Sequence, residues 1–376
     1  MMDLDVIQFW KDDAVAHKDN CFNKDAPQVA MGLRMSDECV FAELGEEGHP
    51  WDYTPPERMR ELCRRYNDKA EKIVGKRVLS EDYPIQPQRF PYIPRIGEIF
   101  GGRYSIINHI EWLESDVKTP QELEKLLDKV EKMDISDFVH PDNWEKEVKA
   151  IYEKTGIKPD PIELWGHEIR GPVTLATSIY GAEKLIFLIS DEPELAARFS
   201  RAILDAVIKR SKTIDIMCGY NENNFPHGYK FYDDNCCLLT PEMYEEFAYP
   251  ILKKVFNRWS PDDGDERYQH SDSDMRHIIP ILARLKLTAC NFGPTVLVDK
   301  IRAFMPNTRI DGCISPLAFM NNDEDEISAQ VRRDCEMVKK LGCRGLNIDT
   351  AGSVNNGSKL TSMRLVMAAI QKYGRY

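Results

Sequence analysis

The residues best suited to chemistry in this 376-residue chain are one histidine and the carboxylates near it. His270 and Asp272 are two residues apart, so on an extended segment their side chains project to the same side. That spacing suits a shared metal ion or an acid–base pair of imidazole and carboxylate. Asp234 ends another apolar segment and offers a further carboxylate. A structural role is the alternative, because Asp234 could belong to a helix cap and Asp272 to a solvated helix start.

Polar side chains also end the other short apolar segments of the chain. They are Arg34, His167 with Glu168, Asp233 with Asp234, Cys290 with Asn291, Asp311 with Cys313, and Asn347 with Asp349. In a parallel barrel the C-terminal ends of the strands form one mouth, where active sites lie. We therefore take His270, Asp234 and Asp272 as candidate catalytic residues or metal ligands. Arg34, His167 and Asn291 are candidate substrate-binding residues, although structural roles explain Arg34 and His167 equally well.

These side chains would be positioned by strands that alternate with helices. The expected strands are 28–33, 162–165, 229–232, 267–269, 287–292, 309–312 and 345–348. The expected helices are 54–75, 119–133, 191–212, 240–255, 326–341 and 359–373. Several helices begin with capping signals, such as Thr119 followed by Pro120 and Glu122. This alternation predicts βαβ units and a parallel sheet.

We therefore predict an α/β fold, a (β/α)8 TIM barrel with an N-terminal helical and loop extension. The eighth strand would lie between residues 76 and 107, beside a Pro-, Gly- and aromatic-rich loop (80–108) over one mouth. Residues 1–110 would hold the extension, the first barrel strand and this insertion. Residues 111–376 would form the remainder of the barrel, giving one domain overall. No GxGxxG segment follows a predicted strand, which counts against a Rossmann fold.

Composition excludes some classes of function. The net charge of -12 argues against binding to nucleic acid or to an anionic membrane. No run approaches the roughly 18 apolar residues of a transmembrane helix, and the N-terminus lacks the apolar core of a signal peptide. A cytoplasmic location is therefore expected. The ten cysteines include no CxxC pair and are interpreted as reduced thiols. The sequence leaves a homodimer open.

Several segments resemble the uroporphyrinogen decarboxylase superfamily, which includes the corrinoid-dependent methyltransferases. They are GHEIRGPVTLATSIYGAEKLIFLISDEPELAARF (166–199), FYDDNCCLLTPEMYEEFAYPILKKVF (231–256), the His270 segment and GLNIDTAGSVNNGSKLTSMRLVMAAIQKYG (345–374). The resemblance is weaker in the first 110 residues. It implies a (β/α)8 barrel whose site lies at the barrel mouth.

Within that superfamily the methyltransferases usually bind zinc through a His-x-Cys motif and a later cysteine. Here the motif becomes His270-Ser271-Asp272, and the later cysteine is missing near Ala351. Together with Asp234, the residues His270 and Asp272 form an oxygen-rich set of candidate ligands. A metal ion bound there could polarise an ether oxygen, which is otherwise a poor leaving group in methyl transfer. The resemblance thus implies a zinc-dependent O-demethylase component. It would pass the methyl group of a small methoxylated, aromatic substrate to a corrinoid carried by a partner protein.

Two alternatives remain at this point. The first is a cofactor-free decarboxylase of the uroporphyrinogen decarboxylase type. Those enzymes hold substrate carboxylates with an arginine-rich N-terminal segment, where this chain has only Arg34. The second is a non-catalytic subunit that binds a ligand or a partner protein.

Overall fold

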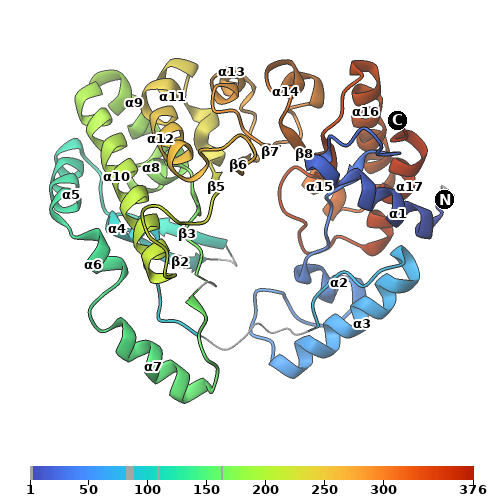
Figure 1. Cartoon of the computed structure of the whole chain (residues 1–376), viewed down its shortest axis with the longest axis horizontal. Coiled ribbons are helices and arrows are strands. Elements are labelled where there is room, and N and C mark those ends of the chain that lie inside the picture. Colours follow the sequence, from blue (N-terminus) through green and yellow to red (C-terminus); the bar gives the residue numbers. More distant parts are fainter. Residues whose placement is uncertain (1–2, 82–88, 108–109, 162–163) are drawn as a thin grey trace. The chain divides into compact units, whose positions relative to one another are not determined.

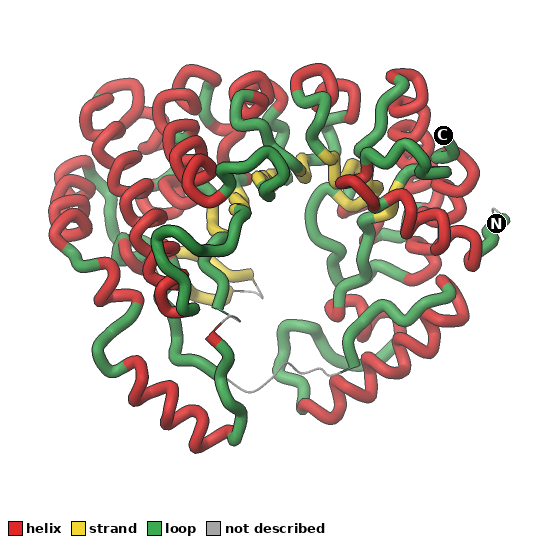
Figure 2. Tube along the Cα trace, in the orientation of Figure 1, coloured by secondary structure: helices red, strands yellow, loops and turns green. Residues whose placement is uncertain are grey.

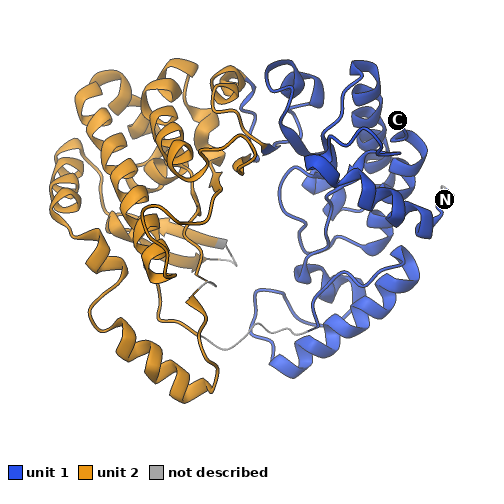
Figure 3. Ribbon diagram, in the orientation of Figure 1, with its two compact units in different colours: residues 1–85, 271–276, 289–376 blue, residues 86–270, 277–288 orange. Residues whose placement is uncertain are grey.

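The computed structural model describes residues 3–81, 89–107, 110–161 and 164–376. The chain divides into two compact units, which Figure 3 shows in different colours. The first unit holds Met1–Ile85, Ser271–Arg276 and Ala289–Tyr376, and the second holds Gln86–His270 and His277–Thr288.

The first unit contains parallel strands in the order β1-β9-β8-β7. The strands are β1 (Ala30–Met31), β7 (Ala289–Phe292), β8 (Arg309–Ile314) and β9 (Leu346–Thr350). The helices are α1 (Val6–Ala16), α2 (Val40–Leu44), α3 (Pro56–Val74), α14 (Val298–Phe304), α15 (Pro316–Met320), α16 (Glu324–Leu341) and α17 (Leu360–Tyr373). Helices separate β7, β8 and β9 along the chain, as βαβ units require (Figure 1).

The second unit contains parallel strands in the order β6-β5-β4. They are β4 (Glu168–Arg170), β5 (Tyr229–Tyr232) and β6 (Arg267–Ser271), whose last residue belongs to the first unit. The helices are α4 (Ile96–Ile99), α5 (Pro120–Lys132), α6 (Ile135–Val139), α7 (Trp144–Thr155), α8 (Pro172–Tyr180), α9 (Ala182–Asp191), α10 (Pro193–Met217), α11 (Pro241–Phe247), α12 (Tyr249–Trp259) and α13 (Ile279–Ala283). A separate antiparallel pair joins β2 (Arg103–Ile107) to β3 (Ile110–Glu114) (Figure 2).

Strand β5 of the second unit has one apolar face and one polar face. Alternate residues of a strand point to opposite faces of a sheet. Tyr229 and Phe231 are buried, and their rings contact Trp259 and Phe256 of α12 at centroid distances of 5.5 Å each. The residues that alternate with them, such as Tyr232, are only partly buried. The opposite face is therefore left for polar groups.

Three sequence predictions need correction. The predicted strand 162–165 falls partly on residues 162–163, which lie outside the described residues. Residues 164–165 are not in a strand, Trp165 is half exposed, and the strand of this region is β4 at Glu168–Arg170. The helix predicted at 240–255 breaks at Ala248 into α11 and α12. A proline cannot donate the backbone hydrogen bond that would continue a helix, and Pro250 stands in the first turn of α12.

The third correction concerns the predicted loop at 80–108 and the eighth strand. The described part of this region contains α4 and β2, and β2 pairs antiparallel with β3. Hence none of its described residues joins the parallel strands, and residues 82–88 lie outside the description. The predicted domain boundary at residue 110 stays a prediction.

In the described part of the chain, no individual helix combines the length and apolar composition that crossing a membrane requires. Helices α8 and α9, with a bend of 102° between them, meet those two criteria only as a pair.

Candidate functional site

The polar face of the second unit gathers ionisable groups from its three strands. Arg170, Tyr232 and His270 are in register on β4, β5 and β6, so their side chains project from the same face. The Tyr232 hydroxyl donates a hydrogen bond to Glu168 Oε1 at 2.7 Å, and its ring lies 5.6 Å from that of His270. A phenol, an imidazole and a guanidinium are therefore arranged along one row.

His270 also contacts a carboxylate on this face. Its Nε2 atom lies 3.6 Å from Oδ1 of Asp234, the first residue of the short 3-10 helix Asp234–Leu238 that follows β5. The His270 side chain is 16% exposed and that of Asp234 is 44% exposed. The structure thus brings together two of the three predicted metal ligands, and the Asp234 side chain is partly exposed to solvent.

The neighbouring Asp233 has a structural role. It is fully buried, and its Oδ1 accepts the backbone N–H of Thr174 at 2.7 Å in the first turn of α8. Burial raises the pKa of Asp233 to about 6, although its hydrogen bonds to Thr174 and Val173 oppose that shift. Asp233 therefore caps a helix, as carboxylates do at N-termini, and Asp234 is the one left to the polar face.

Asp272 belongs to the first unit, directly after β6 on the chain. Its carboxylate approaches the turn after β9 closely, since a Cβ atom added at Gly352 would stand 2.8 Å from Asp272 Oδ1. Gly352 has a φ of +124°, which side chains rarely adopt. This turn, next to the buried Ala351, is where the superfamily resemblance implies a cysteine ligand. The turn lies close to Asp272, but it has Ala351 and Gly352 where a cysteine ligand is expected.

His167 lies in the core of the second unit and not on the polar face. It is fully buried, its Nε2 lies 2.7 Å from Asp215 Oδ1, and its ring stacks on Tyr229 at 5.6 Å. Asp215 also accepts a hydrogen bond from Trp259 Nε1 at 2.9 Å. These contacts join the start of β4 to α10 and α12, so they favour the structural interpretation of His167. Its role in substrate binding stays a prediction.

Arg34 borders a polar cavity of about 450 Å³ within the first unit. Asp349, at the end of β9, lines the same cavity and was not among the predicted site residues. Loss of hydration and the nearby charge of Asp311 raise the pKa of Asp349 to about 7, against the opposing charge of Arg34. Groups that titrate near neutral pH in a cavity are common at functional sites.

Asp311 and Asn291 hold the strands of the first unit together. Arg309 donates two hydrogen bonds to the Asp311 carboxylate, at 2.8 and 2.9 Å, and Asn347 donates a third at 2.8 Å. Asn291 is buried, and its Nδ2 donates to the carbonyl oxygens of Asp311 and Thr350. The side chain of Asn291 therefore ties β7 to β8 and β9, and its predicted contact with substrate stays a prediction.

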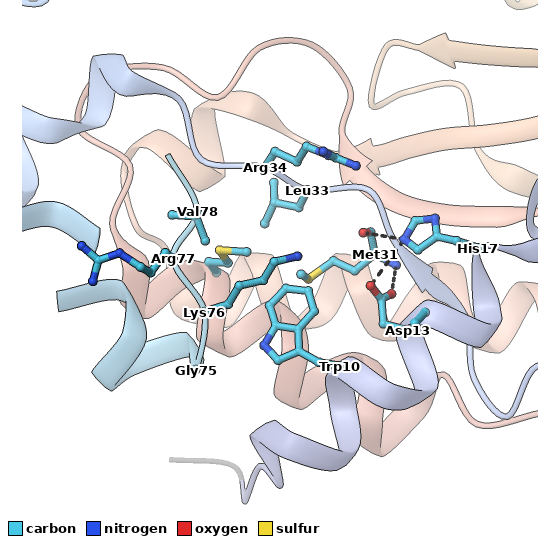
Figure 4. Close-up of a pocket in the computed structure, with 12 residues that line it drawn as sticks. Trp10, Asp13, His17, Met31, Leu33, Arg34, Gly75, Lys76, Arg77 and Val78 are labelled. Atoms are coloured by element: carbon cyan, nitrogen blue, oxygen red, sulfur yellow. Dashed lines mark hydrogen bonds and ion pairs between the residues drawn. The ribbon is translucent and has the colours of Figure 1, made fainter. Parts of the chain in front are cut away.

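A second cavity of the first unit, of about 540 Å³, has an apolar wall and cationic groups (Figure 4). Trp10, Met31 and Leu33 form part of its lining, and the Lys76 ammonium lies 4.7 Å from the centroid of the Trp10 ring. Arg34 borders this cavity as well as the polar one. Both cavities can therefore place an anionic group of a ligand near the Arg34 guanidinium.

Residues 118–373, more than half of the chain, match the uroporphyrinogen decarboxylase (URO-D) family. The chain belongs to this family. Among solved structures it is similar to a methyltransferase from Methanosarcina mazei, with 13% sequence identity and a TM-score of 0.52. That match covers 93% of this chain and 95% of the other. A comparison with curated proteins gives no match.

These findings confirm the predicted superfamily and fold class. The uroporphyrinogen decarboxylase family has the TIM-barrel fold, and the parallel strands with intervening helices in each unit are its building blocks. At 13% identity the likeness to the methyltransferase shows a shared fold alone.

Proposed function

We propose that this protein is a corrinoid-dependent methyltransferase. It would move the methyl group of a small methoxylated aromatic compound to the cobalt of a corrinoid carried by a separate protein. The observation that carries the proposal is the His270–Asp234 pair on the polar face of β4, β5 and β6. Family membership and the fold shared with a methyltransferase support it.

The pair fits the zinc ion that the superfamily resemblance implies. Ligand bonds of 2.0–2.2 Å in a tetrahedral zinc site separate two ligand atoms by about 3.4 Å. The distance between His270 Nε2 and Asp234 Oδ1 is 3.6 Å. Asp272, two residues after His270 on the chain, is our proposed third ligand. When bound, zinc supplies a Lewis acid for the ether oxygen of the substrate.

The remaining groups would bind and orient the substrate. Arg170 Nη1 donates to Ser178 Oγ at 2.9 Å, which fixes a guanidinium on the same face as His270. A fixed positive charge favours the negative charge that develops on a departing phenolate oxygen. Arg34, in the first unit, stays a predicted substrate-binding residue. Tyr232, held by Glu168, would limit the orientations of the aromatic ring.

The test is an incubation of the whole chain with cobalt(I) cobalamin and a panel of methoxylated aromatic compounds, followed by the absorbance of methylcobalamin. His270→Ala should lower the rate on the order of 100-fold, because even outer-shell partners of a metal site cost 10- to 100-fold. His227→Ala is the matched control. His227 lies with Asp262 and Asp265 in another group that has ligand geometry in the second unit.

Zinc content separates the two histidines further. The zinc that supports methyl transfer should be lost in His270→Ala and kept in His227→Ala. Methyl transfer that survives in His270→Ala would overturn the proposed site. Carboxylate loss from a porphyrinogen by zinc-free protein would favour the decarboxylase, and ligand binding without turnover would favour the non-catalytic subunit.

A further inference from the structure

Three reactive side chains recur at intervals of four residues near the N-terminus: Asp13, His17 and Cys21. Asp13 lies on α1, His17 follows it, and Cys21 ends the 3-10 helix Lys18–Cys21. His17 Nδ1 is 3.9 Å from Cys21 Sγ, and His17 Nε2 is 3.4 Å from Asp13 Oδ2. One imidazole therefore links a thiol to a carboxylate, which is the arrangement of an activated cysteine nucleophile.

The carboxylate of this group is fixed by the first barrel strand. Asp13 is 5% exposed, and its Oδ1 accepts the backbone N–H of Met31 at 2.8 Å. His17 Nε2 also lies 3.2 Å from the Met31 carbonyl oxygen, as Figure 4 shows. The hydrogen bond to Asp13, followed by that to Cys21, raises the pKa of His17 to about 10. At neutral pH the imidazole is therefore protonated and donates on both sides.

The backbone that carries the thiol is strained. Asp19, Asn20 and Cys21 have φ values of 52°, 53° and 66°, a left-handed run without a glycine. Contacts from elsewhere in the first unit hold it, because Gly345 N–H donates to the Cys21 carbonyl at 2.9 Å and Arg309 Nη1 donates to Asn20 Oδ1 at 2.6 Å. Strain that tertiary contacts impose is typical of functional sites.

Cys21, which is 5% exposed, and His17 both line the polar cavity of about 450 Å³. A small molecule in that cavity would lie beside Cys21 and polar groups such as Arg309 and Asn347. Burial raises the pKa of six other thiols, which favours their unreactive form. They are Cys39, Cys63, Cys218, Cys290, Cys313 and Cys335.

We propose that Cys21 is a reactive-thiolate site for small polar electrophiles, in which His17 holds the thiol proton and Asp13 orients His17. With iodoacetamide the sulfur attacks the methylene carbon, an S–C bond forms, the C–I bond breaks and iodide leaves. The proton stays on His17. The site does not depend on the proposed methyl transfer.

The test is alkylation of the native full chain with limiting iodoacetamide, read residue by residue by mass spectrometry between pH 6 and 9. Cys343, which is partly buried, is the internal reference. An ordinary thiol with a pKa near 8.5 is only about 1% thiolate at pH 6.5. Cys21 should therefore react about tenfold faster than Cys343 at pH 6.5, after allowance for the weaker nucleophilicity of a stabilised thiolate. Its rate should also rise less steeply with pH than that of Cys343.

His17→Gln should slow Cys21 about tenfold at pH 6.5 and give it a rate that rises more steeply with pH, and Asp13→Asn should have a smaller effect in the same direction. The pH profile of Cys21 alkylation in the wild type requires no variant. It therefore still tests the proposal if His17→Gln or Asp13→Asn fails to fold. A wild-type rate at Cys21 that rises with pH like that of Cys343, or an unchanged profile in folded His17→Gln, would overturn the proposal.

Discussion

Replacing Asp349 with asparagine should stabilise the protein above neutral pH. The pKa of this carboxyl is raised from 3.8 to about 7. The folded protein therefore keeps a proton that the unfolded chain releases above pH 4. Stability falls as the pH rises from about 4 to 7 and stays reduced above that range, because the ionised carboxylate is less well solvated in the cavity than in the unfolded chain.

The size of the stability change follows from the pKa shift of Asp349. About three pKa units correspond to about 4 kcal/mol as an upper bound, at 1.36 kcal/mol per unit. Asp349 is partly exposed, so screening by solvent reduces this to about 2 kcal/mol. Asparagine retains an oxygen that can accept the Thr350 N–H, which lies 2.8 Å from Asp349 Oδ1, and it carries no charge. The free energy of unfolding of Asp349→Asn should therefore exceed that of the wild type by about 2 kcal/mol at pH 8.

The assay is urea unfolding followed by tryptophan fluorescence at several pH values from 5 to 8.5. The increase in the free energy of unfolding of Asp349→Asn over the wild type should be smallest at pH 5 and largest above pH 8. Asp311→Asn is the matched control, because it removes a carboxylate that Arg309 and Asn347 satisfy. It should destabilise the protein by about 2 kcal/mol or more. A lower stability of Asp349→Asn than of the wild type at pH 8, or an effect that does not vary with pH, would contradict the raised pKa of Asp349.

Two further substitutions test local contacts. Asp233→Ala removes the cap of α8, so the free energy of unfolding should fall by about 1 kcal/mol; a melting temperature equal to that of the wild type would contradict the capping role. Gly352→Ala places a methyl group 2.8 Å from Asp272 Oδ1 at a φ of +124°, which should cost about 1–3 kcal/mol and weaken zinc binding at least tenfold. Zinc titration against a competing chelator measures the affinity, and an unchanged value would contradict the proposed role of Asp272.

Elements with local signals could be predicted from the sequence. The capping box of α5 forms as its residues indicate, since Glu122 N–H donates to Thr119 Oγ1 and Thr119 N–H donates to Glu122 Oε2. The bounds of β5, Tyr229–Tyr232, match the apolar segment. Strand β4 was misplaced because Glu168-Ile169-Arg170 has only one buried residue, so its pairing with β5 leaves little trace in the sequence.

The candidate site likewise has features that the sequence predicts and features that depend on tertiary contacts. The position of His270 and Asp234 near the C-terminal ends of neighbouring strands indicated that they would meet, because strand ends converge in a parallel sheet. The choice between Asp233 and Asp234 depends on which one reaches α8, and that is a tertiary contact. The group formed by Asp13, His17 and Cys21 was missed, although its four-residue spacing is a helical signal. Its link to β1 could not be seen in the sequence.

Anomalous diffraction at the zinc absorption edge, from crystals of the zinc-loaded protein, tests the central claim most directly. The account predicts a peak about 2.0–2.2 Å from both His270 Nε2 and a carboxylate oxygen of Asp234. Crystals of His227→Ala should keep this peak. A peak found only beside His227, or none near His270, would contradict the account.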